Sequence, residues 1–204
     1  MPYVYSMDFA AAPTFTGRLA TLEQLSTDHI DDLIAAVTDG ELWKTWYTHI
    51  PEPSQVAAEV ERRLAAQASG SIAAWSIRRN DTGAVCGVTT YLNIAAEHRR
   101  LEIGSTWMAP SAHGSGINAD AKLLLLTRAF ETLGCNVVEF RTHWHNQQSR
   151  AAIARLGAKQ DGVLRNHQVW DDGTLRDTVV FSIISGEWPA VRSGLLARVA
   201  RHVA

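Results

Sequence analysis

The sequence predicts an α+β protein with a mixed, mostly antiparallel sheet and helices on both of its faces. Three observations support this fold class. Two helix-favouring segments lie early in the chain, and three β-rich segments follow them in a row. A helix-then-strand step then interrupts the β-rich segments near the middle of the chain. That step predicts one parallel pair of strands at the centre of the sheet.

The first part of the chain predicts one strand and two helices. Residues 17–25, GRLATLEQL, favour a short strand, and Ser26 or Thr27 then caps a helix that runs to about Val37. Residues 51–68, PEPSQVAAEVERRLAAQA, favour a second helix, because two prolines precede its start and Ala, Glu and Arg have high helix propensity.

The rest of the chain predicts a strand meander followed by alternating helices and strands. Three strands at residues 72–79, 84–94 and 99–108 form the meander, with a turn at NDTG after the first. A helix then runs to about Leu133 and ends at Gly134. The later elements are a strand at 136–144, a helix at 146–157, a hairpin of 162–170 with 175–184, and a C-terminal helix at about 187–202.

Length and composition predict one domain over residues 1–204, with a loose leader at residues 1–14. The formal net charge of -2 provides no overall field for nucleic acid or an anionic membrane. No window approaches the roughly 20 apolar residues of a bilayer span, so we expect a cytoplasmic protein. Cys86 and Cys135 have no metal-ligand spacing and are expected to be reduced, buried thiols.

The segment PSAHGSGINADAKLLLLTRAF, residues 110–130, places a glycine-rich turn directly before an apolar helix. The first N–H groups of a helix lack partners and carry a partial positive charge, which favours an anion. Gly114 and Gly116 permit positive φ and a close approach of the backbone to a phosphate. The alternative is a tight strand-to-helix turn without a ligand. The pattern is neither a Walker loop nor the full dinucleotide fingerprint.

From Glu102 through HGSGIN to NQQSRAAIARLGA the chain resembles the GNAT acyltransferase superfamily, and within it the RimJ/RimL-like N-acetyltransferases. The likeness spans about Arg18 to Trp188. It implies the GNAT fold, acetyl-CoA as co-substrate, and a loop whose amides hold the CoA pyrophosphate. The residues of that loop are His113, Gly114, Ser115, Gly116, Ile117 and Asn118. His113 stands where the family has Arg or Gln, which leaves its side-chain role open between a polar loop residue and a catalytic one.

Glu102 lies in RRLEIGSTW, on the strand before the loop, with its side chain opposite those of Leu101 and Ile103. The resemblance implies that Glu102 is the general base, acting through water. The alternative is a solvated strand glutamate or one in an ion pair, with Arg99 or Arg100.

Asn146 and Ser149 open the second helix after the loop and are expected to cap it. The resemblance implies that Asn146 also meets the pantetheine arm of CoA and that Ser149 lies near the CoA sulfur. Many family members have a tyrosine acid at the position of Ile153, which cannot donate a proton. We therefore assign Glu102 and Ser149 as the candidate catalytic residues.

Three further groups of side chains need an explanation. Trp43, Trp46 and Tyr47 have helical spacing, and the resemblance places them in the acceptor pocket, with core packing as the alternative. Lys122 falls on the apolar stripe of the loop helix, so its ammonium must snorkel out or reach a cofactor phosphate. His143 and His145 alternate onto one strand face, but without further ligands they predict no metal site.

The sequence thus predicts an N-acetyltransferase that transfers an acetyl group from acetyl-CoA to a primary amine by direct attack in a ternary complex. The acceptor is the α-amine of a protein N-terminus or a small-molecule amine, and neither nucleic acid nor a membrane is an expected partner. A homodimer is one alternative for the oligomeric state. Two rival functions are a non-catalytic acyl-CoA binding or sensing module and a nucleotide-binding domain with a similar loop.

Overall fold

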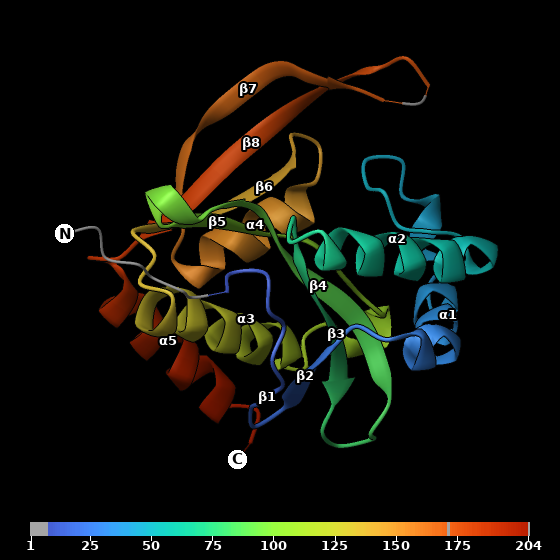
Figure 1. The fold of residues 1–204 in the computed structure, drawn as a ribbon, viewed down its shortest axis with the longest axis horizontal. Helices are drawn as coiled ribbons and strands as arrows, with labels where there is room; N and C mark the ends of the chain where they lie inside the picture. The colour runs from blue at the N-terminus through green and yellow to red at the C-terminus, as the bar shows by residue number, and fades with distance from the viewer. Residues whose placement is uncertain (1–7, 171, 204) are drawn as a thin grey trace.

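The computed structural model describes residues 8–170 and 172–203, and their strands form an eight-stranded sheet in the order β1-β2-β3-β4-β5-β6-β8-β7 (Figure 1). All neighbouring strands are antiparallel except β5 and β6. The predicted fold class, with its single parallel pair, is therefore confirmed. The strands are β1 (Phe15–Thr16), β2 (Ala20–Gln24), β3 (Ala73–Arg79), β4 (Val85–Ala95), β5 (Arg100–Met108), β6 (Val137–His143), β7 (Lys159–Val169) and β8 (Leu175–Ile184).

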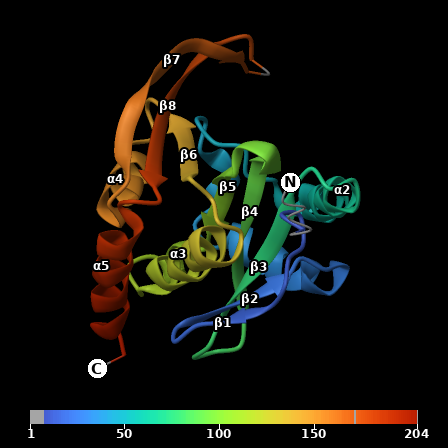
Figure 2. The ribbon, with the colours of Figure 1, turned by 60° about the vertical axis from the view of Figure 1, so that its left-hand side comes forward.

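Helices cover both faces of this sheet, with α2 on one face and α3 on the other (Figure 2), and α1 lies beside α2 (Figure 1). Ser26 caps a 3₁₀ turn that leads into α1, and His29 completes the capping box by accepting from the Ser26 backbone N–H. No helix among the described residues combines the length and the apolarity needed to cross a bilayer. The helices are α1 (Ile30–Thr38), α2 (Val56–Ala68), α3 (Ile117–Thr127), α4 (Gln147–Leu156) and α5 (Trp188–Ala200).

The helix predicted to run to Leu133 has two parts. The α-helical part ends at Thr127, and a π-helical turn covers Arg128–Thr132 before Gly134 reverses the chain with φ of 63°. Arg128 is buried, and its guanidinium donates to the carbonyl oxygens of Ala11 at 2.6 Å and Asp8 at 3.0 Å. The wider turn thus lies at a buried contact that a helical sequence pattern does not register.

The segment predicted as a loose leader is packed over its described part, residues 8–14. Phe9 and Ala12 are buried in the core, and the Pro13 carbonyl accepts from the Trp75 indole at 2.9 Å. With the Arg128 bonds, these contacts hold the segment across one end of the sheet. Residues 1–7 of the predicted leader lie outside the described residues.

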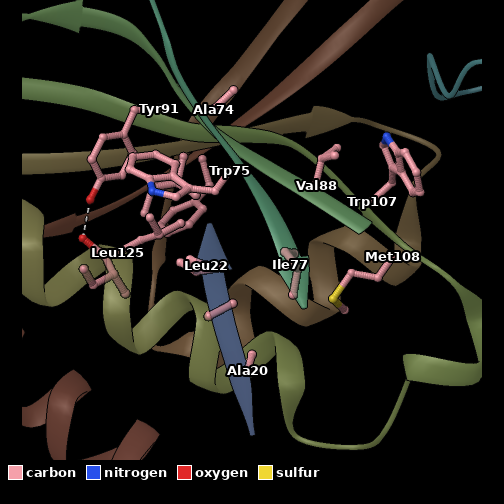
Figure 3. Close-up of a cluster of buried hydrophobic side chains, with 14 of the residues drawn as sticks. Ala20, Leu22, Ala74, Trp75, Ile77, Val88, Tyr91, Trp107, Met108 and Leu125 are labelled. Atoms are coloured by element: carbon pink, nitrogen blue, oxygen red, sulfur yellow. Dashed lines mark hydrogen bonds between the residues drawn. The ribbon is translucent and has the colours of Figure 1, made fainter. Parts of the chain in front are cut away.

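The centre of the core lies between the sheet and α3 (Figure 3). Trp75 and Tyr91 are fully buried and meet edge-on with ring centroids 4.9 Å apart. The Tyr91 hydroxyl donates to the Leu125 carbonyl oxygen of α3, which satisfies a phenol that no water can reach. Burial raises the Tyr91 pKa, so the hydroxyl stays protonated as that donor. Both cysteines are buried free thiols, as expected.

The start of α3 is fixed to the sheet by Asp120. Its buried carboxylate accepts from the backbone N–H groups of Leu19 at 2.7 Å and Ala20 at 3.0 Å. A Cβ at Gly17 would lie 2.3 Å from a carboxylate oxygen of Asp120, so glycine is required at that turn. These bonds hold the N-terminus of α3, and the glycine loop before it, in a set position relative to β2.

Lys122 lies one turn after the loop and does not snorkel to the surface. Its side chain is buried, and Nζ donates to the hydroxyls of Thr89 at 3.0 Å and Thr106 at 2.9 Å. Burial lowers the pKa of this amine to about 7. The snorkelling alternative assumed an exposed end, whereas two facing strand threonines provide hydrogen-bond acceptors inside the protein. Contact of Lys122 with a cofactor phosphate stays a prediction.

The Lys122 amine makes stability depend on pH in a predictable direction. Its pKa is about 7 in the folded protein against an ordinary value of 10.5, so between these pH values the unfolded chain binds more protons. Stability therefore rises with pH across this window. We expect the melting temperature of the parent to rise relative to that of Lys122→Met between about pH 7 and pH 10.

Melting curves at several pH values measure this difference, with the exposed Lys44→Met as the matched control. The control should follow the parent at every pH. Parallel curves for the parent and Lys122→Met would show that the amine is not buried in the way described.

Candidate active site

A cleft of about 730 Å³ opens between β5 and β6 and continues to the loop before α3. The two strands pair over only three residue pairs, ending at Glu102 with Glu139, and then separate. Among the described residues that line the cleft, Glu102 is the one carboxylate. Basic side chains outnumber it, which favours an anionic ligand. They are Lys122, Arg141, Arg155, Arg176 and Arg198.

The glycine loop forms one wall of the cleft. Gly114 and Gly116 have φ of 75° and 85°, and α3 begins at the next residue. Within the described part of the chain, no acceptor is bonded to the backbone N–H groups of Gly114, Ser115, Gly116 and Asn118. Unpaired amides at the start of a helix form a cradle for an anion. The geometry thus fits a pyrophosphate bound by main-chain donors.

The two glycines are required for different reasons. A Cβ at Gly116 would lie 2.6 Å from the His202 ring and 2.7 Å from Leu19, so packing within the protein already demands glycine there. A Cβ at Gly114 would meet nothing within 4 Å. Only a ligand approaching the loop would contact a side chain at Gly114, which makes it the more informative position to change.

The other predicted loop residues divide into two groups. His113 and Asn118 line the cleft, and the His113 Nε2 atom lies 3.1 Å from the Met108 carbonyl oxygen, to which it donates. This bond ties the His113 ring to the end of β5. Ser115 donates its hydroxyl to the Ala112 carbonyl at 2.7 Å, and Ile117 is buried in the core, so neither side chain faces the cleft.

Helix α4 brings Asn146, Ser149 and Ile153 to the cleft. Asn146 is the N-cap, as predicted, and its side-chain oxygen accepts from the Ser149 backbone N–H at 2.9 Å. The Ser149 hydroxyl has no partner among the described residues. Ile153 is buried one turn later, so the tyrosine position of the family holds an apolar side chain here. The cap therefore depends on Asn146 and leaves the serine hydroxyl available to a ligand.

Glu102 is buried and held by two neighbouring strands. Asn93 donates to its Oε2 at 2.7 Å, and the Arg141 guanidinium lies 3.5 Å from the same atom. Burial raises the Glu102 pKa, although the Asn93 hydrogen bond and the Arg141 charge oppose this shift. A carboxyl with a raised pKa is suited to proton transfer nearer neutral pH.

The alternative of an ion pair at Glu102 is borne out, but its expected partner, Arg99 or Arg100, was wrong. The partner is Arg141 of β6, while Arg100 pairs with Glu139 at 3.2 Å. Arg100 lies two residues from Glu102 and shares its face, but its guanidinium pairs with Glu139 on the adjacent strand, whereas Arg141 of that parallel strand lies beside Glu102.

The cleft joins two faces of the sheet. Lys122 reaches Thr89 and Thr106 from α3, so the side chains on that face lie beside the glycine loop. Glu102 and Arg141 meet on the opposite face, because Glu102 shares its face with Gly104, and Thr90 opposite Gly104 accepts from Arg63 of α2. A ligand on the loop and a second molecule beside Glu102 would therefore approach from opposite sides and meet where β5 and β6 separate.

The spacing of Trp43, Trp46 and Tyr47 predicted that they lie on one helix, and this prediction was wrong. A 3₁₀ turn covers Leu42–Lys44, and the chain then turns through Trp46 and Tyr47 without a helix. Trp43 is half-buried against the core, which bears out the packing alternative for that residue alone. Tyr47 lines the cleft, whereas Trp46 is 62% exposed.

The loop that carries these aromatics contacts the end of β6 and the β7–β8 hairpin. The Trp46 ring lies 5.4 Å from the rings of both His143 and His145, and His49 stacks on Trp170 at 3.9 Å. Figure 1 shows this hairpin arching over the end of the sheet. Rings from three separate parts of the chain thus gather on this side, and Tyr47, His49 and His143 line the cleft.

Among the described residues, no group of three or more His, Cys, Asp or Glu side chains that could hold a metal ion is found, at His143 and His145 or elsewhere. Instead, the His143 Nδ1 atom accepts from the His145 backbone N–H at 3.0 Å. The two rings are 5.4 Å apart at their centroids.

Sequence reasoning missed Asn93, Arg141 and Arg176 as residues of the cleft. Arg141 had a readable signal, because it alternates with His143 on the strand beside Glu102. Asn93 and Arg176 had none, since their positions depend on register between strands and on the long hairpin.

The comparisons with known proteins agree with this geometry. The family model described as "Acetyltransferase (GNAT) domain" matches residues 20–159. The Bacillus subtilis (strain 168) protein named "Putative ribosomal N-acetyltransferase YdaF" is 34% identical over 106 residues, which are 52% of this chain and 57% of that protein. The match thus spans less than two thirds of that relative's own length.

Solved structures show the same fold over nearly the whole chain. A GCN5-related N-acetyltransferase from Brucella melitensis is 30% identical, with a TM-score of 0.83 over 93% of this chain and 86% of that one. Mycobacterium smegmatis RimJ in complex with CoA-disulfide is 20% identical and has a TM-score of 0.79 over 94% and 97% of the two chains. The predicted RimJ/RimL-like resemblance is confirmed, and the chain belongs to the GNAT acetyltransferase family.

Proposed function

We propose that this protein is an N-acetyltransferase that uses acetyl-CoA to acetylate a primary amine by direct attack in a ternary complex. One observation carries the proposal. A cradle of unpaired backbone amides on one face of the sheet and a buried carboxylate on the other face open into the same cleft. Transfer of an acetyl group to an amine needs both an anchored anionic acetyl donor and a base for the amine.

The glycine loop is suited to the CoA pyrophosphate. Its amides carry the partial positive charge of the α3 N-terminus, and Arg155 and Arg198 line the same cleft. The pantetheine arm would then follow the opening between β5 and β6, past Asn146. Backbone N–H groups of β5 beyond Glu102 have no partner strand on the β6 side and are suited to polarise the thioester carbonyl.

The reaction forms a C–N bond and breaks a C–S bond. The amine lone pair attacks the thioester carbon, and the amine proton leaves through water to Glu102. The electron pair of the C–S bond goes to sulfur, and the Ser149 hydroxyl donates a hydrogen bond to the thiolate as it departs. The products are the amide and CoA.

An α-amine is a better match to this site than a lysine amine. Its reference pKa of about 7.7–8 leaves part of it neutral near pH 7, whereas a lysine at about 10.4 requires a stronger base. Glu102 acting through water is a weak base. A relative is named a ribosomal N-acetyltransferase, which also supports a protein N-terminal α-amine, and a small-molecule amine is the other acceptor class.

A non-catalytic acyl-CoA sensor is the second candidate, because Ile153 replaces the tyrosine acid and His113 the usual loop residue. Release of CoA thiol from acetyl-CoA, measured with panels of amines and N-terminal peptides, separates the two. An acetyltransferase releases thiol only with an acceptor present. Tight CoA binding without turnover on any amine would favour the sensor.

Gly114→Ala tests the loop. We expect the dissociation constant for CoA to rise about tenfold or more, because the added Cβ enters the space of the phosphate. Gly134→Ala is the matched control, since Gly134 also has positive φ and open space around its Cβ but lies at the far end of the helix. Calorimetry should show normal CoA affinity in the control. Equal affinities in both variants would remove the loop from the binding site.

Glu102→Gln should bind CoA normally and lose activity most severely at low pH, where the amine is protonated and needs a base. We expect kcat/KM to fall about 100-fold near pH 6–7, with a smaller loss as the pH rises. Glu139→Gln is the control, because Glu139 shares Arg141 but does not line the cleft. A pH–rate profile of unchanged shape in Glu102→Gln would assign Glu102 a structural role only.

Ser149→Ala should lower kcat about tenfold to a hundredfold with little change in CoA binding. A thiol with a pKa near 8.5 is already a tolerable leaving group, so the help from a hydroxyl is modest. The helix cap survives this change because Asn146 accepts from the backbone N–H of residue 149.

Asn146→Ala, which removes the cap, is the comparison for stability and should cost about 1 kcal/mol. Single-turnover rates and melting temperatures should be measured on the same preparations of the parent, Ser149→Ala and Asn146→Ala proteins. A Ser149→Ala enzyme as fast as the parent would mean that the hydroxyl plays no part in thiolate departure.

A further inference from the structure

Arg176 on β8 is a cation without a partner at the acceptor side of the cleft. Its Nε atom is inaccessible to solvent and has no hydrogen-bond partner among the described residues. Nor does any carboxylate of residues 8–170 and 172–203 pair with it, whereas Arg141 in the same cleft pairs with Glu102 and Glu139. A half-buried guanidinium without acceptors is costly, and a ligand with an anionic group would relieve that cost.

The position of Arg176 is set by an aromatic ring. The guanidinium carbon lies 5.8 Å from the centroid of the Trp170 ring, on which His49 also stacks at 3.9 Å. At this distance the ring face attracts the guanidinium and restricts its position. Arg176 is therefore held in place before a ligand arrives, which lowers the entropy cost of binding.

His143 supplies a second donor beside Arg176. Its ring meets the same Trp170 at 5.8 Å, and its Nδ1 atom already accepts from a backbone N–H. Burial, followed by the charges of Arg176 and His145, lowers the His143 pKa, so the ring is neutral at pH 7. In a neutral ring whose Nδ1 accepts, Nε2 carries the proton and donates. His143 is thus a donor here rather than a base.

We propose that Arg176 and His143 form a subsite for an anionic group of the acceptor, so that the acceptor is a primary amine that also carries a carboxylate or a phosphoryl group. This inference rests on the proposed acetyltransferase function. Glu102 stands in the same cleft, and its charge acts on Arg176. The amine is directed toward the carboxylate and the anion toward the guanidinium, which fixes the orientation of a bifunctional acceptor.

Matched acceptor pairs test the subsite. L-alanine against L-alaninamide probes an α-carboxylate, and O-phosphoethanolamine against ethanolamine probes a phosphoryl group. A peptide with N-terminal Glu against one with N-terminal Gln probes a side-chain carboxylate. For at least one pair, we expect the anionic member to have a kcat/KM about tenfold to a hundredfold above that of the neutral one.

Arg176→Gln should bring that ratio close to one, and Arg176→Lys should restore part of it. Comparing ratios cancels the intrinsic difference in amine pKa within each pair. Arg165→Gln is the matched control, because Arg165 lies on the same hairpin, is exposed and pairs with Asp177. The control should keep the parent's ratio. A ratio that Arg176→Gln leaves unchanged, or a parent without preference in every pair, would overturn the subsite.

Calorimetry of the same compounds with the CoA complex keeps this test separate from the proposed function. If anionic members bind through Arg176 but no amine is acetylated, the acetyltransferase proposal fails and the subsite stands. If amines are acetylated equally well with and without an anionic group, the subsite fails and the acetyltransferase proposal stands. Failure of every anionic member either to bind or to react would also overturn the subsite.

Discussion

The short parallel pairing of β5 with β6 is the constraint on which the rest of the site depends. Three residue pairs hold the strands together up to Glu102, and beyond that point they diverge. Divergence leaves backbone groups of both strands without ladder partners and opens the sheet from one face to the other. Because β5 leads into the glycine loop and β6 into α4, the helix start and the Asn146 cap come to the same opening.

Buried polar contacts hold this opening in one geometry. Asp120 fixes the start of α3 to β2, and Lys122 ties the next turn to Thr89 and Thr106. On the other face, Asn93 and Arg141 orient Glu102. Each of these groups would cost free energy if left unpaired, so the loop and the carboxylate are positioned before any ligand binds.

Patterns of neighbouring residues in the sequence correctly predicted the features that depend on short-range interactions. The fold class, the parallel step, the Ser26 and Asn146 caps and the glycine turn all follow from short-range signals, and the structure bears them out. The partners of Lys122 could not be predicted, because they depend on how the neighbouring strands β4 and β5 bring Thr89 and Thr106 together. The loop around Trp46 looked helical because aromatic spacing alone cannot show that the chain turns back onto β6.

Hydrogen exchange of the backbone amides at 114–118, measured with and without CoA, is the sharpest test of whether these amides bind the CoA pyrophosphate. Apart from Ile117, whose N–H donates to the Ser115 hydroxyl, these amides have no acceptors among the described residues, so they should exchange quickly in the free protein. We expect CoA to slow exchange at Gly114, Ser115 and Gly116 in particular, because the pyrophosphate would accept hydrogen bonds from their N–H groups. If CoA binds but the exchange rates of the loop amides do not change, the pyrophosphate is not held by this loop.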